Sequence, residues 1–397
     1  MDSNETFQFA GPRFSAEAVE AIPLSLYLHW PWCVRKCPYC DFNSHAAPSS
    51  LNDEAYVDAV LKDLAAWQGQ TGNRPISSVF VGGGTPSLMS GKALGRLLEG
   101  ADRLFSFAPD CEITLEANPG TVDESRFADF RRAGVNRLSI GVQSFIDEKL
   151  RRLGRIHSSD EARHAAEAAS KIFDNFNLDV MFALPGESLE ELASEVRNAV
   201  STGATHLSFY QLTIEEGTAF AKKMPQDLPD DDLCADMSDL VVSALARAGF
   251  EHYEVSGYAK PGRRCRHNLN YWTFGDYLAA GAGAHGKLTT PEGIVREKRL
   301  MSPKHYMEAV ATSGHGIEER EAVEPDALPF EFMLNVLRLT EGVPSVLFTE
   351  RTGLVRETIE PTLSRLRAEG LLLSDTELIR PTEKGMAFLS EVQEAFL

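Results

Sequence analysis

Residues 25–42 read SLYLHWPWCVRKCPYCDF and join a short apolar run to a loop that holds three cysteines. The run at 25–29 is apolar enough to predict a buried strand, and two prolines keep the loop that follows it out of helix. Cys33, Cys37 and Cys40 have the spacing C-x3-C-x2-C, so their three thiolates can face one point. This clustering predicts a metal centre rather than a disulfide framework.

Three cysteines leave the type of metal centre open between two alternatives. Full cysteine ligation of a four-iron cluster needs four thiolates, so three of them leave one iron free to bind a small molecule. The alternative is a structural zinc site in which His45 or His29 is the fourth ligand. The spacing alone does not separate a cluster from zinc.

A pattern of short strand, polar loop and amphipathic helix repeats about six times between residues 25 and 258. This alternation predicts a parallel sheet covered by helices. The expected strands are residues 25–29, 78–81, 112–115, 137–140, 178–182 and 206–210. The expected helices are residues 55–67, 94–105, 125–132, 162–173, 189–201 and 231–248, with Asp123 and Ser188 as N-caps and Gly134 and Gly203 as C′ residues.

Polar or glycine-rich segments follow the expected strands at the same end. They are the cysteine loop, the segment GGGTPS at 82–87, Glu116, Gln143, Asp179 and Gln211. An open sheet gathers its ligands at one switch point, whereas a barrel gathers them from many strands at one face. The fold class we predict is therefore α/β, a partial (β/α)6 TIM-like barrel with its site at the carboxyl ends of the strands.

The glycines at 82–84 allow the backbone to approach a ligand closely. The segment lacks the spacing of a Walker loop or of a dinucleotide fingerprint, so phosphate and dinucleotide binding are weak readings. A tight turn without any ligand is the alternative.

The chain divides into four expected parts. Residues 1–22 form an N-terminal arm, 23–258 the barrel, and 259–325 an irregular, glycine-rich connecting segment. Residues 326–397 read as a small, mainly helical domain that resembles a winged helix. This last part has 12 acidic and 7 basic residues, which favours protein contacts over DNA binding.

The composition excludes several classes of protein. The chain has 58 acidic and 39 basic residues, a formal charge of −19, which disfavours nucleic acid as a main partner. No apolar run is long enough for a transmembrane segment, and no signal peptide pattern stands at the start. We expect a protein of the reducing cytoplasm.

Four motifs together closely resemble the radical SAM (S-adenosylmethionine) superfamily, and within it the group of oxygen-independent coproporphyrinogen III dehydrogenases and HemW heme chaperones. They are YLHWPWCVRKCPYCDF at 27–42, GGGTPS at 82–87, LSIGVQ at 138–143 and LGRIH at 153–157. The resemblance covers nearly the whole chain. It implies a [4Fe-4S] cluster on Cys33, Cys37 and Cys40, SAM chelated to the open iron, and a reducing electron donor that enables cleavage of SAM to a 5′-deoxyadenosyl radical.

The resemblance also implies which residues hold SAM. Gly83, Gly84 and Thr85 would meet its amino group. Arg155 would pair with its carboxylate, and Glu116 would accept its ribose hydroxyls. The remaining SAM residues that the resemblance implies are Tyr27, Tyr39, Gln143, Asp179 and Gln211.

Phe42 distinguishes between the two branches of this group. Coproporphyrinogen dehydrogenases carry a fourth cysteine at this position and a longer N-terminal arm, whereas the heme chaperones have phenylalanine. The chaperones also share a motif H-N-x-x-Y, here residues 267–271. The resemblance thus implies that heme is cargo passed to heme-accepting proteins, with His267 as a candidate axial ligand and Tyr271 as its neighbour or alternative. The alternative is that this cluster only caps and anchors its loop.

Three functions follow in order of preference. The first is a heme chaperone, in which His285 is a second ligand candidate. The next is an oxygen-independent coproporphyrinogen III dehydrogenase, and the third is a zinc-stabilised scaffold without redox chemistry. The sequence does not assign a catalytic residue, and it leaves enzymatic activity open.

Overall fold

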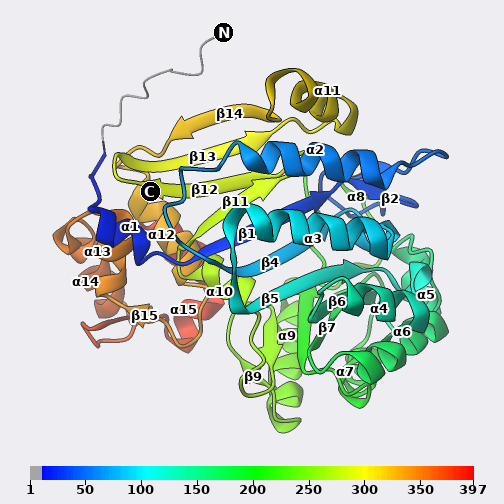
Figure 1. The fold of residues 1–397 in the computed structure, drawn as a ribbon. Coiled ribbons are helices and arrows are strands. Elements are labelled where there is room, and N and C mark those ends of the chain that lie inside the picture. Colours follow the sequence, from blue (N-terminus) through cyan, green and yellow to red (C-terminus); the bar gives the residue numbers. More distant parts are fainter. Residues whose placement is uncertain (1–10) are drawn as a thin grey trace.

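One twelve-stranded sheet organises the structure, a computed structural model that describes residues 11–397 (Figure 1). Residues 1–10 of the expected N-terminal arm lie outside the described residues. The strand order is β14-β13-β12-β11-β1-β4-β5-β6-β7-β8-β10-β9. Its central strands are parallel: β1 (Leu24–Trp30), β4 (Ile76–Gly83), β5 (Phe107–Ala117), β6 (Arg137–Gln143), β7 (Phe176–Phe182) and β8 (His206–Gln211). All six strands expected from the sequence are confirmed, in the parallel arrangement of a partial (β/α)6 barrel.

Helices cover the outer face of these strands. They are α2 (Asp53–Ala65), α3 (Gly91–Phe105), α4 (Glu124–Arg132), α6 (Ser159–Ile172), α7 (Leu189–Ser201) and α9 (Asp231–Arg247), with the short α5 (Asp147–Arg152) after β6. The side chains of Asp123 and Ser188 accept the expected N-cap hydrogen bonds. Gly134 and Gly203 have the positive φ that a C′ glycine adopts.

The two faces of each barrel strand differ in chemistry. In β1, Leu24, Leu26 and Leu28 belong to the main apolar core under the helices. Between them, Ser25 and Tyr27 point to the other face, because successive side chains of a strand alternate. There the hydroxyl of Ser25 lies 2.8 Å from that of Ser78 in β4. The interior of the barrel is therefore lined with polar groups.

The connecting segment, expected to be irregular, instead extends the sheet, so that expectation was wrong. It forms α10 (Arg266–Trp272), β11 (Asp276–Ala280), β12 (His285–Thr290), β13 (Gly293–Arg299), α11 (Pro303–Ser313) and β14 (Ile317–Ala322). β11 lies parallel to β1, and β12 to β14 follow antiparallel. Buried charges such as Lys287 and Arg299 interrupt the apolar pattern, and Gly281 and Gly283 lie in the turn between β11 and β12.

The other edge of the sheet carries two short antiparallel strands. β10 (Gly257–Ala259) pairs with β8, and β9 (Glu251–His252) pairs with β10. No helix within residues 11–397 is long and apolar enough to cross a lipid bilayer.

The C-terminal part has a second apolar core and the expected winged-helix-like outline. Its elements are α12 (Leu328–Val336), β15 (Val343–Pro344), α13 (Val346–Thr352), α14 (Glu360–Ala368), β16 (Leu378–Ile379), α15 (Glu383–Ala387) and α16 (Leu389–Glu394). Phe332 and Phe348 pack edge to face in this core at 5.4 Å between ring centroids. The N-terminal helix α1 (Ala16–Glu20) adds Val19 to the same core.

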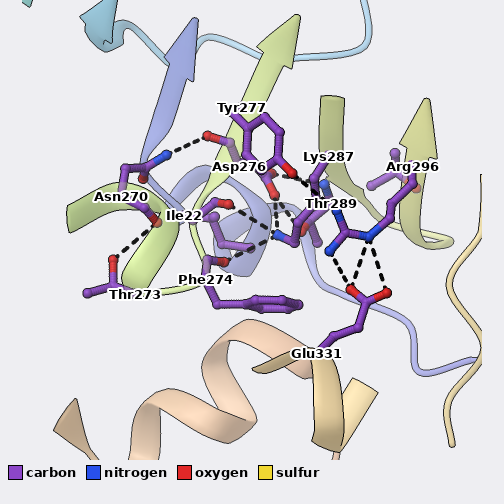
Figure 2. A network of polar contacts seen from close by, with 12 residues as sticks. Ile22, Asn270, Thr273, Phe274, Asp276, Tyr277, Lys287, Thr289, Arg296 and Glu331 are labelled. Atoms are coloured by element: carbon purple, nitrogen blue, oxygen red, sulfur yellow. Dashed lines mark hydrogen bonds and ion pairs between the residues drawn. The ribbon is translucent and has the colours of Figure 1, made fainter. Parts of the chain in front are cut away.

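A buried polar network joins the barrel to the C-terminal part (Figure 2). The Asp276 carboxylate, at the start of β11, accepts hydrogen bonds from Arg74 at 2.7 Å and from Lys287 at 2.9 Å. Burial alone would raise the pKa of Asp276, but these two cations hold it below its ordinary value. On β13, Arg296 pairs with Glu331 of α12. The amino-terminal ends of β1 and β11 are thereby closed by buried ion pairs.

Candidate functional site

A cavity of about 440 Å³ opens at the carboxyl ends of the parallel strands, the face that the sequence predicted. A cavity of this volume suits one small organic ligand. It brings together twelve predicted site residues: Cys33, Cys37, Tyr39, Cys40, Gly83, Gly84, Thr85, Glu116, Gln143, Arg155, Asp179 and Gln211.

The cysteine loop is held at both ends by the short parallel strands β2 (Trp32–Cys33) and β3 (His45–Ala46). Cys33 is buried, whereas Cys37 and Cys40 are half-buried and line the cavity. Burial raises the pKa of the Cys33 and Cys40 thiols. A cationic metal centre would reverse this effect, since a coordinating thiol is deprotonated by the metal. All three are free thiols, as an iron–sulfur cluster requires.

The two histidines that a zinc site would need are engaged elsewhere. His29 lies 3.0 Å from the Tyr27 hydroxyl through Nδ1 and 2.8 Å from the Asn43 carbonyl oxygen through Nε2. Nε2 of His45 lies 3.1 Å from Asn43 Oδ1. Both ring nitrogens of His29 are therefore engaged, so the structure does not support this residue as a fourth zinc ligand.

The glycine loop is pinned against the cysteine loop by its backbone. Thr85 donates its N–H to the Trp32 carbonyl at 2.7 Å. A Cβ on Gly83, whose φ is +115°, would lie 2.5 Å from the His29 ring, and one on Gly84 would lie 2.6 Å from the Trp32 carbonyl oxygen. Only glycine fits these two positions, so the loop backbone itself forms part of the cavity wall.

Two carboxyl groups face the cavity from β5 and β7, the strands on either side of β6. Glu116 accepts the Gly83 N–H at 3.0 Å, and Asp179 is held by Ser139 at 3.0 Å and by Asn177 at 2.8 Å. Burial, and then the nearby Asp179, raise the pKa of Glu116 to about 8. The pair can therefore share one negative charge at neutral pH and accept hydrogen bonds from hydroxyl groups of a ligand.

Arg155 has hydrogen-bonding capacity left over. Its Nη2 donates to the Gly141 carbonyl at 2.7 Å, and Nη1 lies 3.6 Å from the Cys37 sulfur. Its buried Nε has no partner among the described residues. Buried donors in native proteins are normally paired, so this unmet N–H beside the cysteine loop fits an anionic ligand such as a carboxylate.

Gln143 adopts a strained backbone conformation where it lines the cavity. Its φ is +66°, a region that residues other than glycine rarely occupy. Strain of this kind gathers at binding sites, where the surrounding structure enforces it. The expected place of Gln143 at the end of its strand is confirmed.

Tyr39 is fixed between the cysteine loop and α8 (Ala219–Lys222). Its ring lies 6.3 Å from that of Phe220, whose N–H donates to the Pro38 carbonyl at 3.0 Å. Burial raises the pKa of Tyr39, so the side chain stays a neutral phenol. The α8 segment thus supports the cysteine loop from outside.

Tyr27 does not line the cavity, contrary to the expected contact with the cofactor. It lies deeper in the barrel interior, where its ring stacks on Phe80 at 6.3 Å and its hydroxyl contacts His29. Since His29 packs on Gly83, Tyr27 acts through that histidine on the glycine loop.

His267 and Tyr271 lie on α10, at the opposite end of the barrel from the cysteine loop. His267 is 1% exposed, and its nitrogens contact Ser78 Oγ at 3.1 Å and the Tyr271 hydroxyl at 2.9 Å. Burial lowers the pKa of His267 to about 3. Neither His267 nor the half-buried Tyr271 offers a free ligand atom in this arrangement, so the structure does not support their expected role as heme ligands. His285 is exposed at the start of β12.

Several cavity residues were not predicted from the sequence. They are Arg35, Asp41, Ser44, Pro86, Ala117, Asn118, Ser139, Gly141, Ile156, Met181, Tyr210, Thr213 and Glu215, and Phe42 joins them. Strand alternation could have indicated Ser139 and Tyr210, because each stands two residues from an inward-facing polar side chain. The loop residues gave no such signal.

Comparisons with known proteins agree with this geometry. The sequence profile of the radical SAM superfamily matches residues 27–199, and that of the HemN C-terminal domain matches residues 323–388. The chain is 48% identical to the heme chaperone HemW of Escherichia coli (strain K12), over 96% of this chain and 99% of that protein. It is 34% identical to HemW of Bacillus subtilis (strain 168), over 94% and 99%.

A solved structure has the same fold. The coproporphyrinogen III oxidase HemN of Escherichia coli, a radical SAM enzyme, superposes with a TM-score of 0.79, over 96% of this chain and 92% of that one. At 22% identity, this likeness concerns the architecture.

Proposed function

Because this chain belongs to the HemW family within the radical SAM superfamily, we propose that it is a heme chaperone, which binds heme and passes it to heme-accepting proteins. One observation carries the proposal: an identity of 48% that extends over 99% of the length of a heme chaperone. The exposed Phe42, at the position where the dehydrogenases of this group have a cysteine, supports the same branch.

We further propose that Cys33, Cys37 and Cys40 hold a [4Fe-4S] cluster. The proposal is supported by three free thiols on one loop at the cavity and by the glycine backbone packed against that loop. When bound, the cluster supplies an electron and one iron that is open to SAM. The thiols need a reducing compartment, which favours the cytoplasm, and a donor that reduces the cluster.

For SAM, the roles follow from the chemistry of the cavity. The unpaired Nε of Arg155 suits the carboxylate of the methionyl group. The carbonyl oxygens of Gly83, Gly84 and Thr85 suit the amino group, and Glu116 suits the ribose hydroxyls. The other residues that we assign to SAM are Tyr39, Gln143, Asp179 and Gln211, while Tyr27 supports the glycine loop.

A heme titration of the full chain tests the function. The anaerobically reconstituted protein should bind heme saturably and then transfer it to an apo-hemoprotein, which visible absorption spectra would follow. A protein that shows no saturable binding is not a heme chaperone.

A second assay separates the alternatives on the same sample. With SAM, a reductant and coproporphyrinogen III, we expect no protoporphyrinogen, whereas turnover would support the dehydrogenase. Iron and acid-labile sulfide should each approach about four per chain. Zinc without sulfide would support the scaffold.

A further inference from the structure

Large apolar side chains that face solvent occur in two places among residues 11–397. One group lies in the C-terminal part: Leu334, Val346, Val355, Phe388 and Leu397. The other group is Val34, Phe42, Ile156, Tyr210, Met224 and Met301. We name this second group the rim cluster.

The rim cluster gathers around the cysteine loop. Phe42, Ile156 and Tyr210 line the cavity itself. Met301 accepts a hydrogen bond from Asn43 of the loop through its carbonyl, at 2.9 Å, and Met224 follows α8, which packs against the loop. Single exposed apolar residues are ordinary on a protein surface, but a group around one cavity mouth indicates a ligand or partner.

Phe42 and Ile156 are the members that best fit a flat apolar ligand. They are 56% and 41% exposed and come from two different loops, so they line the mouth of the cavity on two segments. Tyr210, the third member that lines the cavity, lies on a strand, β8, and not on a loop. A ligand that covers both would remove exposed apolar surface from water.

The charges at the mouth are uneven. Arg35 lines the cavity and makes no hydrogen bond or ion pair with the described residues, and Lys36 donates to the Phe42 carbonyl at 3.0 Å. Asp41 and Glu215 line the same mouth and would repel anions. An anionic group of a bound molecule would therefore turn toward Arg35.

We propose that heme docks across the mouth of this cavity, with its apolar ring on Phe42 and Ile156 and a propionate toward Arg35. The inference rests on the proposed function as a heme chaperone and assigns the heme a binding site. A volume of about 440 Å³ suits one small ligand, so a porphyrin would cover the mouth rather than share the cavity with SAM. At the α10 end, both ring nitrogens of His267 are already engaged.

Heme titration of four charged variants tests this site. The full chain, reconstituted anaerobically, would be compared as wild type, Phe42→Asp, Ile156→Asp and Arg35→Glu. The matched control is Val355→Asp, which puts the same charge on an apolar residue that is 63% exposed in the C-terminal part. We expect Kd for heme to rise about tenfold or more in the first two variants and several-fold in the third. The control should stay within about twofold.

A second readout depends on the location of the heme. Heme over the mouth should slow the release of labelled SAM, and Ile156→Asp should restore the rate seen without heme. Iron and sulfide counts would verify the cluster in each variant. If Phe42→Asp loses its cluster, its heme affinity no longer reports on the site alone. The heme affinity of Ile156→Asp then tests the proposal, because Ile156 stands on a different segment.

The outcomes separate the site from the function. Wild type that binds no heme overturns the heme chaperone itself, and this site with it. Wild type that binds heme while both rim variants bind equally well overturns the site and leaves the chaperone standing. If His267→Ala alone bound heme more weakly, the heme site would lie at α10. That result would also overturn the proposed site.

Discussion

The two ends of the barrel are both rich in polar side chains, but they differ in what surrounds those side chains. At the carboxyl end, Arg155 has an unpaired N–H, and glycine backbone faces the cavity. At the amino end, His267 uses both ring nitrogens and Asp276 is bound by two cations. The polar groups at the carboxyl end thus line a cavity, whereas His267 and Asp276 at the amino end are buried.

The two ends also differ in which of their features are energetically unfavourable. The amino end buries charges whose desolvation is offset by partners within the chain. The carboxyl end keeps a strained Gln143 and two carboxyl groups, of which Asp179 raises the pKa of Glu116. Such features destabilise a fold and persist at binding sites, where the surrounding structure enforces them.

The largest effect is expected from Cys37→Ser. The variant should lose nearly all of its cluster, because two thiolates cannot hold four irons. Iron and sulfide should fall from about four per chain toward zero while the far-ultraviolet circular dichroism is unchanged. His267→Ala, at the other end, should keep full iron, and a loss there would contradict the division between the two ends.

Asp276→Asn should be the most destabilising substitution at the amino end. It leaves Lys287 and Arg74 buried beside a neutral amide, and breaking a buried pair in this way costs about 3–5 kcal/mol. The midpoint of urea unfolding, measured without cofactors, should fall accordingly. Asp110→Asn, which removes a surface partner of Arg266, should leave the midpoint unchanged. Equal effects would refute the buried network.

Tyr271→Phe should lower the stability without changing heme affinity. The variant leaves Nε2 of His267 buried without its partner, which costs about 1–3 kcal/mol. Urea unfolding and heme titration of the same sample would separate these two effects. A changed heme spectrum would assign function to the amino end.

Glu116→Gln should remove a pH dependence of SAM binding. The pKa of Glu116 is raised to about 8, so its carboxylate becomes available to ribose hydroxyls only as the pH rises through that value. Wild type should therefore bind SAM more tightly at pH 9 than at pH 7, by up to about tenfold.

The ratio of wild-type to Glu116→Gln affinity is the decisive measure for that prediction. It cancels the ionisation of SAM itself, which is common to both proteins. Parallel pH profiles would mean that Glu116 does not carry the effect.

The carboxyl end could be predicted from the sequence far better than the amino end. Its strands are apolar runs, and its polar residues follow those runs at a fixed place in the repeat. The cysteine spacing and the glycine loop then indicated which ligands the residues at the strand ends could bind. Twelve of the predicted residues accordingly line one cavity.

The amino end could not be predicted, for two physical reasons. The strands β11 to β14 carry buried ion pairs such as Lys287 with Asp276, which hide their apolar pattern. The location of His267 depends on α10 entering the barrel, a long-range contact with Ser78 that no local pattern encodes.

The place of β11 beside β1 has a consequence for synthesis of the protein. Leu24 pairs with Asp276, so one edge of the first barrel strand finds its neighbour only after most of the chain has been made. A nascent chain that has left the ribosome as far as α9 exposes that edge, and long-range strand pairing is slow. We therefore expect the barrel to complete its folding late in translation, with cluster insertion after it.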